Sequence, residues 1–264
     1  MILREIINSI ESVAPLSYQE QWDNSGLQVG ERDAEIQAAL LTVDITESVV
    51  NEAISRHCDL IISHHPLLFH GLKHITGTTP QERCVALAIQ HNIAIYSAHT
   101  SMDSYLHGVS GRMAEKLGIT EYRILVPQPD QPTVGLGVIG MLPQPMTFND
   151  LTRLVHKAFH TTNFGMRCVP TDHEIHTVAL CGGAGAEFLE DAIAQQADVY
   201  ITADCKYHEM QNAVGRIGLI DLDHWTSEQF AREIFREILS PKMTVYIAES
   251  DHTPVVYMAD SQCE

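Results

Sequence analysis

The chain has few basic residues, and this shortage excludes one broad class of partner. Its 264 residues include 16 lysines and arginines against 34 aspartates and glutamates, which gives a formal net charge of −18. A general nucleic-acid binder needs a basic surface that displaces the counterions around phosphates. General nucleic-acid binding is therefore not expected, although a nucleotide held through metal ions remains compatible with this charge.

The sequence also lacks a long apolar stretch, a secretory leader and paired cysteines. No apolar run is long enough to span a bilayer, and residues 1–7 mix charge into a helical periodicity that signal peptides do not have. The six cysteines form no Cys-x-x-Cys pair and no regular framework. We therefore expect a cytoplasmic protein with reduced thiols and no membrane partner.

Strand and helix patterns alternate along the chain, which predicts an α/β fold with two α/β domains. The proline-rich polar stretch at residues 126–132 is the predicted boundary. The first domain is expected to be discontinuous, with residues 1–126 completed by the C-terminal helix and strands of residues 221–264, and the second to span residues 127–220. Helices are predicted at residues 2–13, 46–55, 79–90, 111–117, 148–159, 186–195 and 227–239, and strands at 40–43, 60–63, 93–97, 135–142, 177–181, 199–202, 244–248 and 254–258.

The adjacent pair His64-His65 is the strongest chemical signal. It follows the apolar run of residues 60–62 and precedes Pro66, which cannot donate to a strand ladder. Both histidines are therefore expected at the carboxyl end of a buried strand, where open α/β sheets bind ligands. Neighbouring side chains of a strand point to opposite faces, so the pair predicts two metal ions, one for each imidazole. The alternative is that one histidine ends the strand and the other is exposed.

Two other segments supply similar residue types. His99 and Asp103 follow the predicted strand at residues 93–97, and an aspartate there can bridge two cations. His224 and Glu228 are four residues apart, which places them on one face of a helix. Such a set suits two first-row divalent ions. The alternatives are that Asp103 caps the following helix and that Glu228 is a favourable first-turn acid.

Two polar segments can also contact a substrate. Asp204, Lys206 and His208 follow the predicted strand at residues 199–202 and can orient a substrate or move protons, unless Asp204 merely caps a helix. The glycine-rich residues 182–185 follow another strand, and their amides can hold an anion. They lack the lysine and hydroxyl of a P-loop.

Four segments together resemble the interacting-factor-three-like family, whose bacterial members are known as type 2 homologues of GTP cyclohydrolase I. They are Asp23-Asn24-Ser25-Gly26-Leu27-Gln28-Val29-Gly30, Ser63-His64-His65-Pro66-Leu67, Ala98-His99-Thr100-Ser101-Met102-Asp103 and His224-Trp225-Thr226-Ser227-Glu228. The resemblance covers nearly the whole chain in the right order. It implies a toroidal homohexamer whose sites face an internal cavity, each with a dinuclear metal centre. The ligands that it implies are His64, His65, Asp103, His224 and Glu228. The third motif usually has Asn-Leu before the aspartate, and Ser101-Met102 here leaves the ligand unchanged.

The residues and the resemblance together predict a dinuclear-metal-dependent hydrolase, GTP cyclohydrolase-like and acting on a purine nucleotide. One ion would polarise the substrate and the other would lower the pKa of a water, while Asp23, His99 or His208 moves protons. Iron, zinc, manganese and nickel all accept histidine and carboxylate ligands. The alternative is a non-enzymatic metal-binding scaffold or regulatory interaction protein whose ions are structural.

Overall fold

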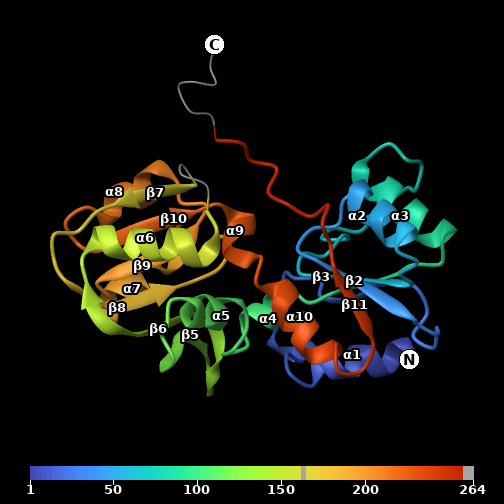
Figure 1. Ribbon diagram of the computed structural model, residues 1–264, viewed down its shortest axis with the longest axis horizontal. Helices are drawn as coiled ribbons and strands as arrows, with labels where there is room; N and C mark the ends of the chain where they lie inside the picture. The colour runs from blue at the N-terminus through green and yellow to red at the C-terminus, as the bar shows by residue number, and fades with distance from the viewer. Residues whose placement is uncertain (162–164, 258–264) are drawn as a thin grey trace, which may run out of the picture. The chain divides into compact units, whose positions relative to one another are not determined.

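The computed structural model describes residues 1–161 and 165–257, which divide into two compact units (Figure 1). Unit 1 comprises Met1–Tyr105 and Gln229–His252, and unit 2 comprises Leu106–Glu228 and the described residues from Thr253 onward. Each unit contains one sheet with helices packed against it. The predicted α/β fold with two α/β domains, the first discontinuous, is confirmed; of the C-terminal helix and strands expected to complete it, the helix and the first strand form.

Unit 1 is built on a five-stranded sheet in the order β1-β4-β3-β2-β11. Neighbouring strands from β4 to β11 are parallel, and β1 pairs with β4 in the antiparallel direction. Every residue of β2, β3 and β4 is buried, as expected for parallel strands that are covered on both faces. The strands are β1 (Gly26–Val29), β2 (Ala38–Thr42), β3 (Leu60–Ser63), β4 (Ala94–Ser97) and β11 (Thr244–Ile247).

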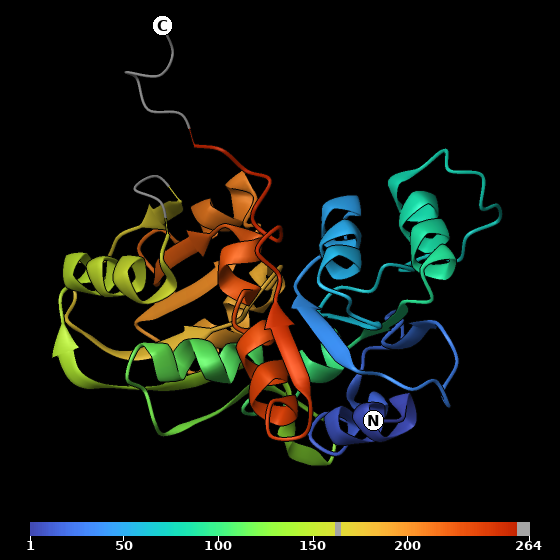
Figure 2. The same ribbon diagram turned by 45° about the vertical axis from the view of Figure 1, so that its right-hand side comes forward.

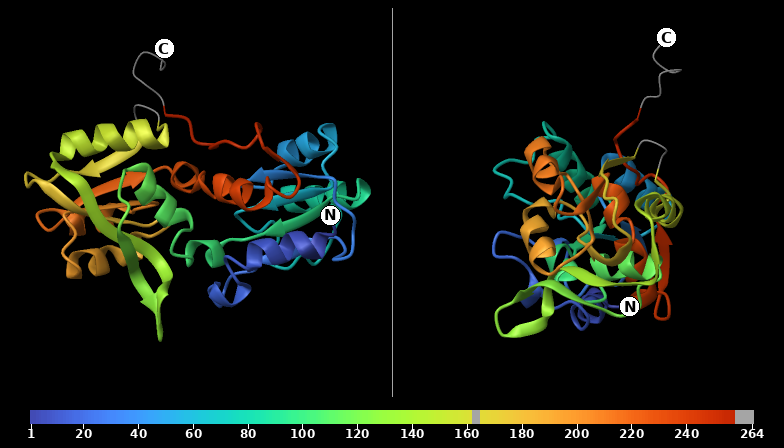
Figure 3. Two further views of the ribbon diagram at one scale, coloured as in Figure 1. Left: turned by 60° about the horizontal axis from the view of Figure 1, so that its bottom comes forward. Right: turned by 90° about the vertical axis from the view of Figure 1, so that its left-hand side faces the viewer.

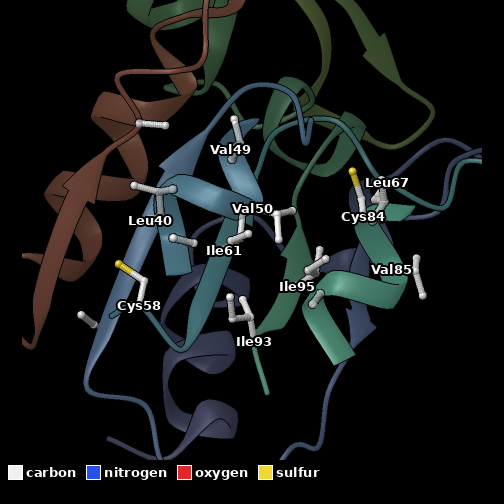
Figure 4. Close-up of a cluster of buried hydrophobic side chains, with 14 residues drawn as sticks. Leu40, Val49, Val50, Cys58, Ile61, Leu67, Cys84, Val85, Ile93 and Ile95 are labelled. Atoms are coloured by element: carbon white, nitrogen blue, oxygen red, sulfur yellow. The ribbon is translucent and has the colours of Figure 1, made fainter. Parts of the chain in front are cut away.

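Helices cover both faces of this sheet (Figures 1 and 2). Helices α1 (Leu3–Glu11) and α10 (Ala231–Leu239) lie on one side, and α2 (Glu47–Ser55) and α3 (Pro80–Gln90) lie on the other. Figure 4 shows the core under α2 and α3, where strand residues such as Leu40 and Ile61 lie in one cluster with Val50 and Val85. Burying each of these side chains stabilises the folded state by about 1.5–3 kcal/mol.

Unit 2 is built on a six-stranded mixed sheet in the order β5-β6-β8-β9-β10-β7. Only β8, β9 and β10 run parallel to one another. Helix α6 covers one face, and α7 and α8 cover the other (Figure 3). The strands are β5 (Tyr122–Gln128), β6 (Gln131–Met146), β7 (Met166–Val169), β8 (Ile175–Leu180), β9 (Val199–Ala203) and β10 (Gly218–Leu222), and the helices of eight or more residues are α5 (Val109–Lys116) and α6 (Phe148–Phe159). Shorter helices are α7 (Leu189–Ala194), α8 (Tyr207–Ala213) and α9 (His224–Glu228), and unit 1 has a short helix α4 (Thr100–Asp103).

The proline-rich stretch at residues 126–132 is a hairpin inside unit 2. Val126 pairs with Leu136, and Gln128 pairs with Gln131 across the turn. Proline is tolerated there because β5 is the edge strand of its sheet and needs no second ladder. The chain instead passes between the compact units at residues 105–106, 228–229 and 252–253, which differ from the predicted limits at 126/127 and 220/221.

Some predicted elements are corrected. The single helix expected at 227–239 consists of α9 and α10, which are separated at residues 229–230. No strand forms at residues 254–257, and residue 258 of that predicted strand lies outside the described residues. Strands β1, β5, β7 and β10 were not predicted. Within the described ranges, no helix has both the length and the apolar character that crossing a membrane requires.

Candidate metal centre

The carboxyl ends of three parallel strands position the unit 1 residues of the candidate centre. Thr42, Ser63 and Ser97 end β2, β3 and β4 and face one another in register. The Ser63 hydroxyl lies 2.8 Å from that of Ser97 and donates to the carbonyl of His65 at 2.7 Å. Side-chain hydroxyls therefore fix the backbone where the histidine pair begins.

Three imidazoles converge just beyond these strand ends. The ring centroid of His64 lies 5.1 Å from that of His65, and each lies 5.3 Å from that of His99. Each of the three residues offers a ring nitrogen, and these nitrogens lie within 4.8 Å of one another. The expectation that His64 and His65 point to opposite faces is wrong, because β3 ends at Ser63 and strand alternation ends with it.

Each of these rings has an acceptor at Nδ1. Carbonyl and carboxylate oxygens can only accept, so Nδ1 carries the hydrogen and Nε2 is the basic nitrogen. Metal-ligating histidines are held in this way. The three pairs are His64 with Ala98 O at 3.0 Å, His65 with Asp44 Oδ1 at 2.8 Å and His99 with Asp23 Oδ1 at 3.0 Å.

Asp103 belongs to the same group in unit 1. It is the last residue of α4, and its Oδ1 lies 3.5 Å from Nε2 of His64. The alternative that it caps the next helix is wrong, because the N-cap of α5 is Gly108. The Asp103 carboxylate thus lies next to Nε2 of His64, the ring nitrogen that carries no hydrogen.

Asp23 is a fully buried acceptor that organises the loop beside His99. It accepts hydrogen bonds from the amide of Asn24, the hydroxyl of Ser25, the ring of His99, and both the amide and hydroxyl of Thr100. Burial alone would raise the pKa of Asp23, but the bonds from His99 and Thr100 and the nearby imidazole hold that pKa well below its usual range. An aspartate that stays ionised suits the orientation of His99 better than proton donation.

In unit 2, His224 and Glu228 form a second group. Asp204 follows the end of β9 and His224 follows the end of β10. Nδ1 of His224 lies 2.7 Å from Oδ2 of Asp204, and its Nε2 lies 3.0 Å from Oε2 of Glu228. The alternative that Asp204 caps α8 is wrong, because that cap is Lys206. The arrangement repeats the histidine–carboxylate pairing of unit 1.

The glycine-rich turn after β8 makes room for Glu228. Gly183 has φ +67°, and a Cβ atom built there would lie 2.1 Å from Oε1 of Glu228. The amides of Gly182, Gly183 and Gly185 donate to hydroxyls inside the fold, which does not support the expectation that they hold an anion. Their acceptors are Ser110, Ser227 and Thr202, respectively.

Two residues stand apart from the sequence expectations. His208, expected to move protons, is exposed on α8, where its ring packs against Tyr207; that role stays a prediction. Asp44 was missed, although it is a carboxylate directly after the predicted strand at residues 40–43. Strand ends at one edge of a parallel sheet are neighbours, so Asp44 could have been found by that rule.

The donor set fits a divalent transition metal. Imidazole rings whose Nδ1 atoms are held by oxygen acceptors, together with the carboxylates of Asp103 and of the buried Glu228, are ligands that iron, zinc, manganese and nickel accept.

Comparison with known proteins identifies the family. The model for Duf34/NIF3 (NGG1p interacting factor 3) matches residues 1–254. The chain belongs to this family. It is 36% identical over 239 residues, 89% of each chain, to a Streptococcus pneumoniae protein named GTP cyclohydrolase 1 type 2 homolog. It is 31% identical to NIF3-like protein 1 of Drosophila melanogaster, over 97% of this chain and 89% of that one.

A solved structure supports the same fold. The Bacillus cereus protein related to NIF3 superposes with a TM-score of 0.88 at 23% identity, covering 97% of this chain and 99% of that one.

Proposed function

We propose that His64, His65, Asp103, His224 and Glu228 bind two divalent metal ions and that this centre catalyses hydrolysis. The observation that carries the proposal is the shared arrangement of the histidine rings. Each ring directs Nδ1 to a carbonyl or carboxylate, and a carboxylate lies beside Nε2 of His64 and of His224. A purely structural histidine needs no such pairing at both nitrogens.

Two of the proposed ligands lie close in sequence to points where the chain passes between the units. Asp103 lies two residues before the chain leaves unit 1, and Glu228 is the last residue before it returns there.

Ions bound by these residues would supply Lewis acidity toward a substrate oxygen and toward water. The protein supplies orientation and proton transfer. Asp44 and Asp204 hold the rings of His65 and His224. Asp23 holds His99 at Nδ1, which leaves its Nε2 to exchange a proton with substrate or water. A purine nucleotide is the proposed substrate, on the support of the relatives' names.

The proposal also covers the cellular compartment and the oligomeric state. We propose a cytoplasmic homohexamer, and the family resemblance supports the assembly. Within the described ranges the cysteines are free thiols, which suits a reducing compartment. They are Cys58, Cys84, Cys168, Cys181 and Cys205.

The decisive experiment replaces Glu228 with glutamine. The change keeps the shape and removes a charge, so we expect metal content to fall and turnover to fall by at least about 10–100-fold, the loss typical of changing even a residue that only orients a metal ligand. Metal should be measured by elemental analysis of protein purified without chelator. Turnover should be measured on metal-replete protein with a panel of nucleotides and simple phosphate esters. Glu190→Gln is the matched control, because Glu190 is an exposed acid of the same unit that pairs with Arg216.

Two results would contradict the proposal. Wild-type protein without bound transition metal would remove the centre altogether. Wild-type protein that binds metal but hydrolyses nothing on the panel, with Glu228→Gln losing metal and melting temperature together, would assign the ions a structural role in a scaffold.

A further inference from the structure

Two large aromatic side chains are exposed together on unit 1. Trp22 is 59% exposed and Phe69 is 41% exposed, and their ring centroids are 5.7 Å apart with an interplanar angle of 42°. Exposed aromatic rings that gather in one place forgo burial, and such patches commonly mark binding sites. The position of these two rings is therefore better explained by ligand binding than by packing in the core.

The pair lies beside the candidate metal centre. The ring of His99 is 5.9 Å from that of Trp22 and 6.1 Å from that of Phe69, between centroids. His99 in turn contacts the rings of His64 and His65. A molecule seated on the two aromatic rings would have its reactive part next to these histidines.

Hydrogen bonds hold both aromatic residues through their neighbours in the chain. Asp23, the residue after Trp22, is fixed by its bonds to His99 and Thr100. Leu68, the residue before Phe69, accepts from the Asn24 amide group at 2.6 Å. The amide of Leu68 also donates to the Gln28 side chain at 3.0 Å. Hydrogen bonds thus connect the two segments that carry Trp22 and Phe69. Because the segments are already held in place, less conformational entropy is lost when a ligand binds.

We propose that Trp22 and Phe69 form the subsite for the planar heteroaromatic base of the substrate. The inference rests on the proposed function, because it names the part of the substrate that this site recognises. Flat π-faces bind nucleobases by stacking and tolerate different bases. The base would stack on the two rings, and the sugar and phosphate would contact the polar groups around His99.

The test compares one ligand with and without its base. Binding of guanosine 5′-monophosphate and of ribose 5-phosphate to metal-loaded protein should be measured by calorimetry for Trp22→Leu and Phe69→Leu. Each change should weaken binding of the nucleotide by about tenfold, the order expected for one lost stacking contact, and leave ribose 5-phosphate unaffected. Trp22→Phe should recover most of the affinity. Tyr246→Leu is the matched control, since Tyr246 is 38% exposed on β11 of the same unit.

The remaining outcomes are also decisive. Equal weakening of both ligands, unchanged nucleotide affinity, or wild-type protein that binds neither compound would overturn the subsite. So would variants that change the assembly mass without changing nucleotide affinity, which would assign the pair to contacts between chains. Elemental analysis of the protein used in the titrations separates the two proposals, because base-selective binding by protein that takes up no metal would contradict the metal centre and keep the subsite.

Discussion

A single oxygen acceptor decides which nitrogen of each candidate histidine carries its hydrogen. Asp44 and Asp204 do this for His65 and His224, and neither residue is among the proposed ligands. Such partners set ring orientation and raise the basicity of the ligand nitrogen. The proposal therefore gives the carboxylates two distinct roles, binding metal or holding a ring, which a search for ligand residues alone would merge.

Replacing Gly183 with alanine should damage the centre through Glu228. The new methyl group would lie 2.1 Å from Oε1 of Glu228, so the carboxylate must move. The left-handed backbone at φ +67°, which an L-residue adopts at a cost of about 1–2 kcal/mol, further lowers the free energy of unfolding. We expect metal stoichiometry to fall, measured by elemental analysis, while the protein remains folded by circular dichroism.

Gly215→Ala is the control for Gly183→Ala. Gly215 has a similar φ of +72°, but a Cβ atom there meets nothing within 4 Å. It should show a comparable loss of stability and unchanged metal content. Equal metal content in both variants would mean that Glu228 is not held where the structure places it.

At the scale of elements, the Glu52 side chain joins α2 to the chain that follows β11. Glu52 accepts hydrogen bonds from the amides of Glu249 and Ser250 and from the Ser250 hydroxyl. Burial alone raises the pKa of Glu52, but these bonds and Arg56 lower it below its usual value. The ionised carboxylate thus helps to hold the last strand of unit 1.

Glu52→Gln should reduce stability in a pH-dependent way. Because the folded-state pKa is lowered, the contribution of Glu52 is present above its unfolded pKa of about 4.3 and is lost as pH falls through the folded value. We expect a loss of about 1–2 kcal/mol in the free energy of unfolding at pH 7. Urea titrations across pH 3–7 should show the variant and wild type converging at the acid end, and a constant difference would exclude this role.

Sequence patterns predicted most of the strands that are buried on both faces and missed several that are not; the wholly buried β10 is an exception that was also missed. The apolar runs of β2, β3 and β4 were recognisable, whereas β1 and β7 are short edge strands with partly exposed residues. The hairpin of β5 and β6 was taken for a boundary because its prolines resemble a linker. The convergence of His64, His65 and His99 was not predictable from strand periodicity, because it depends on the backbone beyond Ser63. Sequence spacing did predict one shared helix face for His224 and Glu228.

At the scale of the whole molecule, the oligomeric state is the property to be tested. A homohexamer should give a mass of about six times the 29.4 kDa chain in light scattering, in line with the closed symmetry common among soluble oligomers. With a net charge of −18 on each chain, repulsion should weaken the assembly at low ionic strength and screening should strengthen it. A monomeric mass at micromolar concentration in 0.15 M salt would contradict the prediction.

The pairing of β11 with β2 has a consequence for synthesis on the ribosome. Tyr246 pairs with Leu40, so roughly 200 residues must be translated before β2 acquires its last neighbour, a delay of roughly 10–40 s at elongation rates of about 5–20 residues per second. Throughout that interval the nascent chain exposes the hydrogen-bonding edge of β2, while residues 106–228 of unit 2 emerge and can fold. Nascent chains on the same polysome carry the same open edge. The interrupted layout of unit 1 therefore makes the period of translation, rather than the finished protein, the stage most exposed to aggregation.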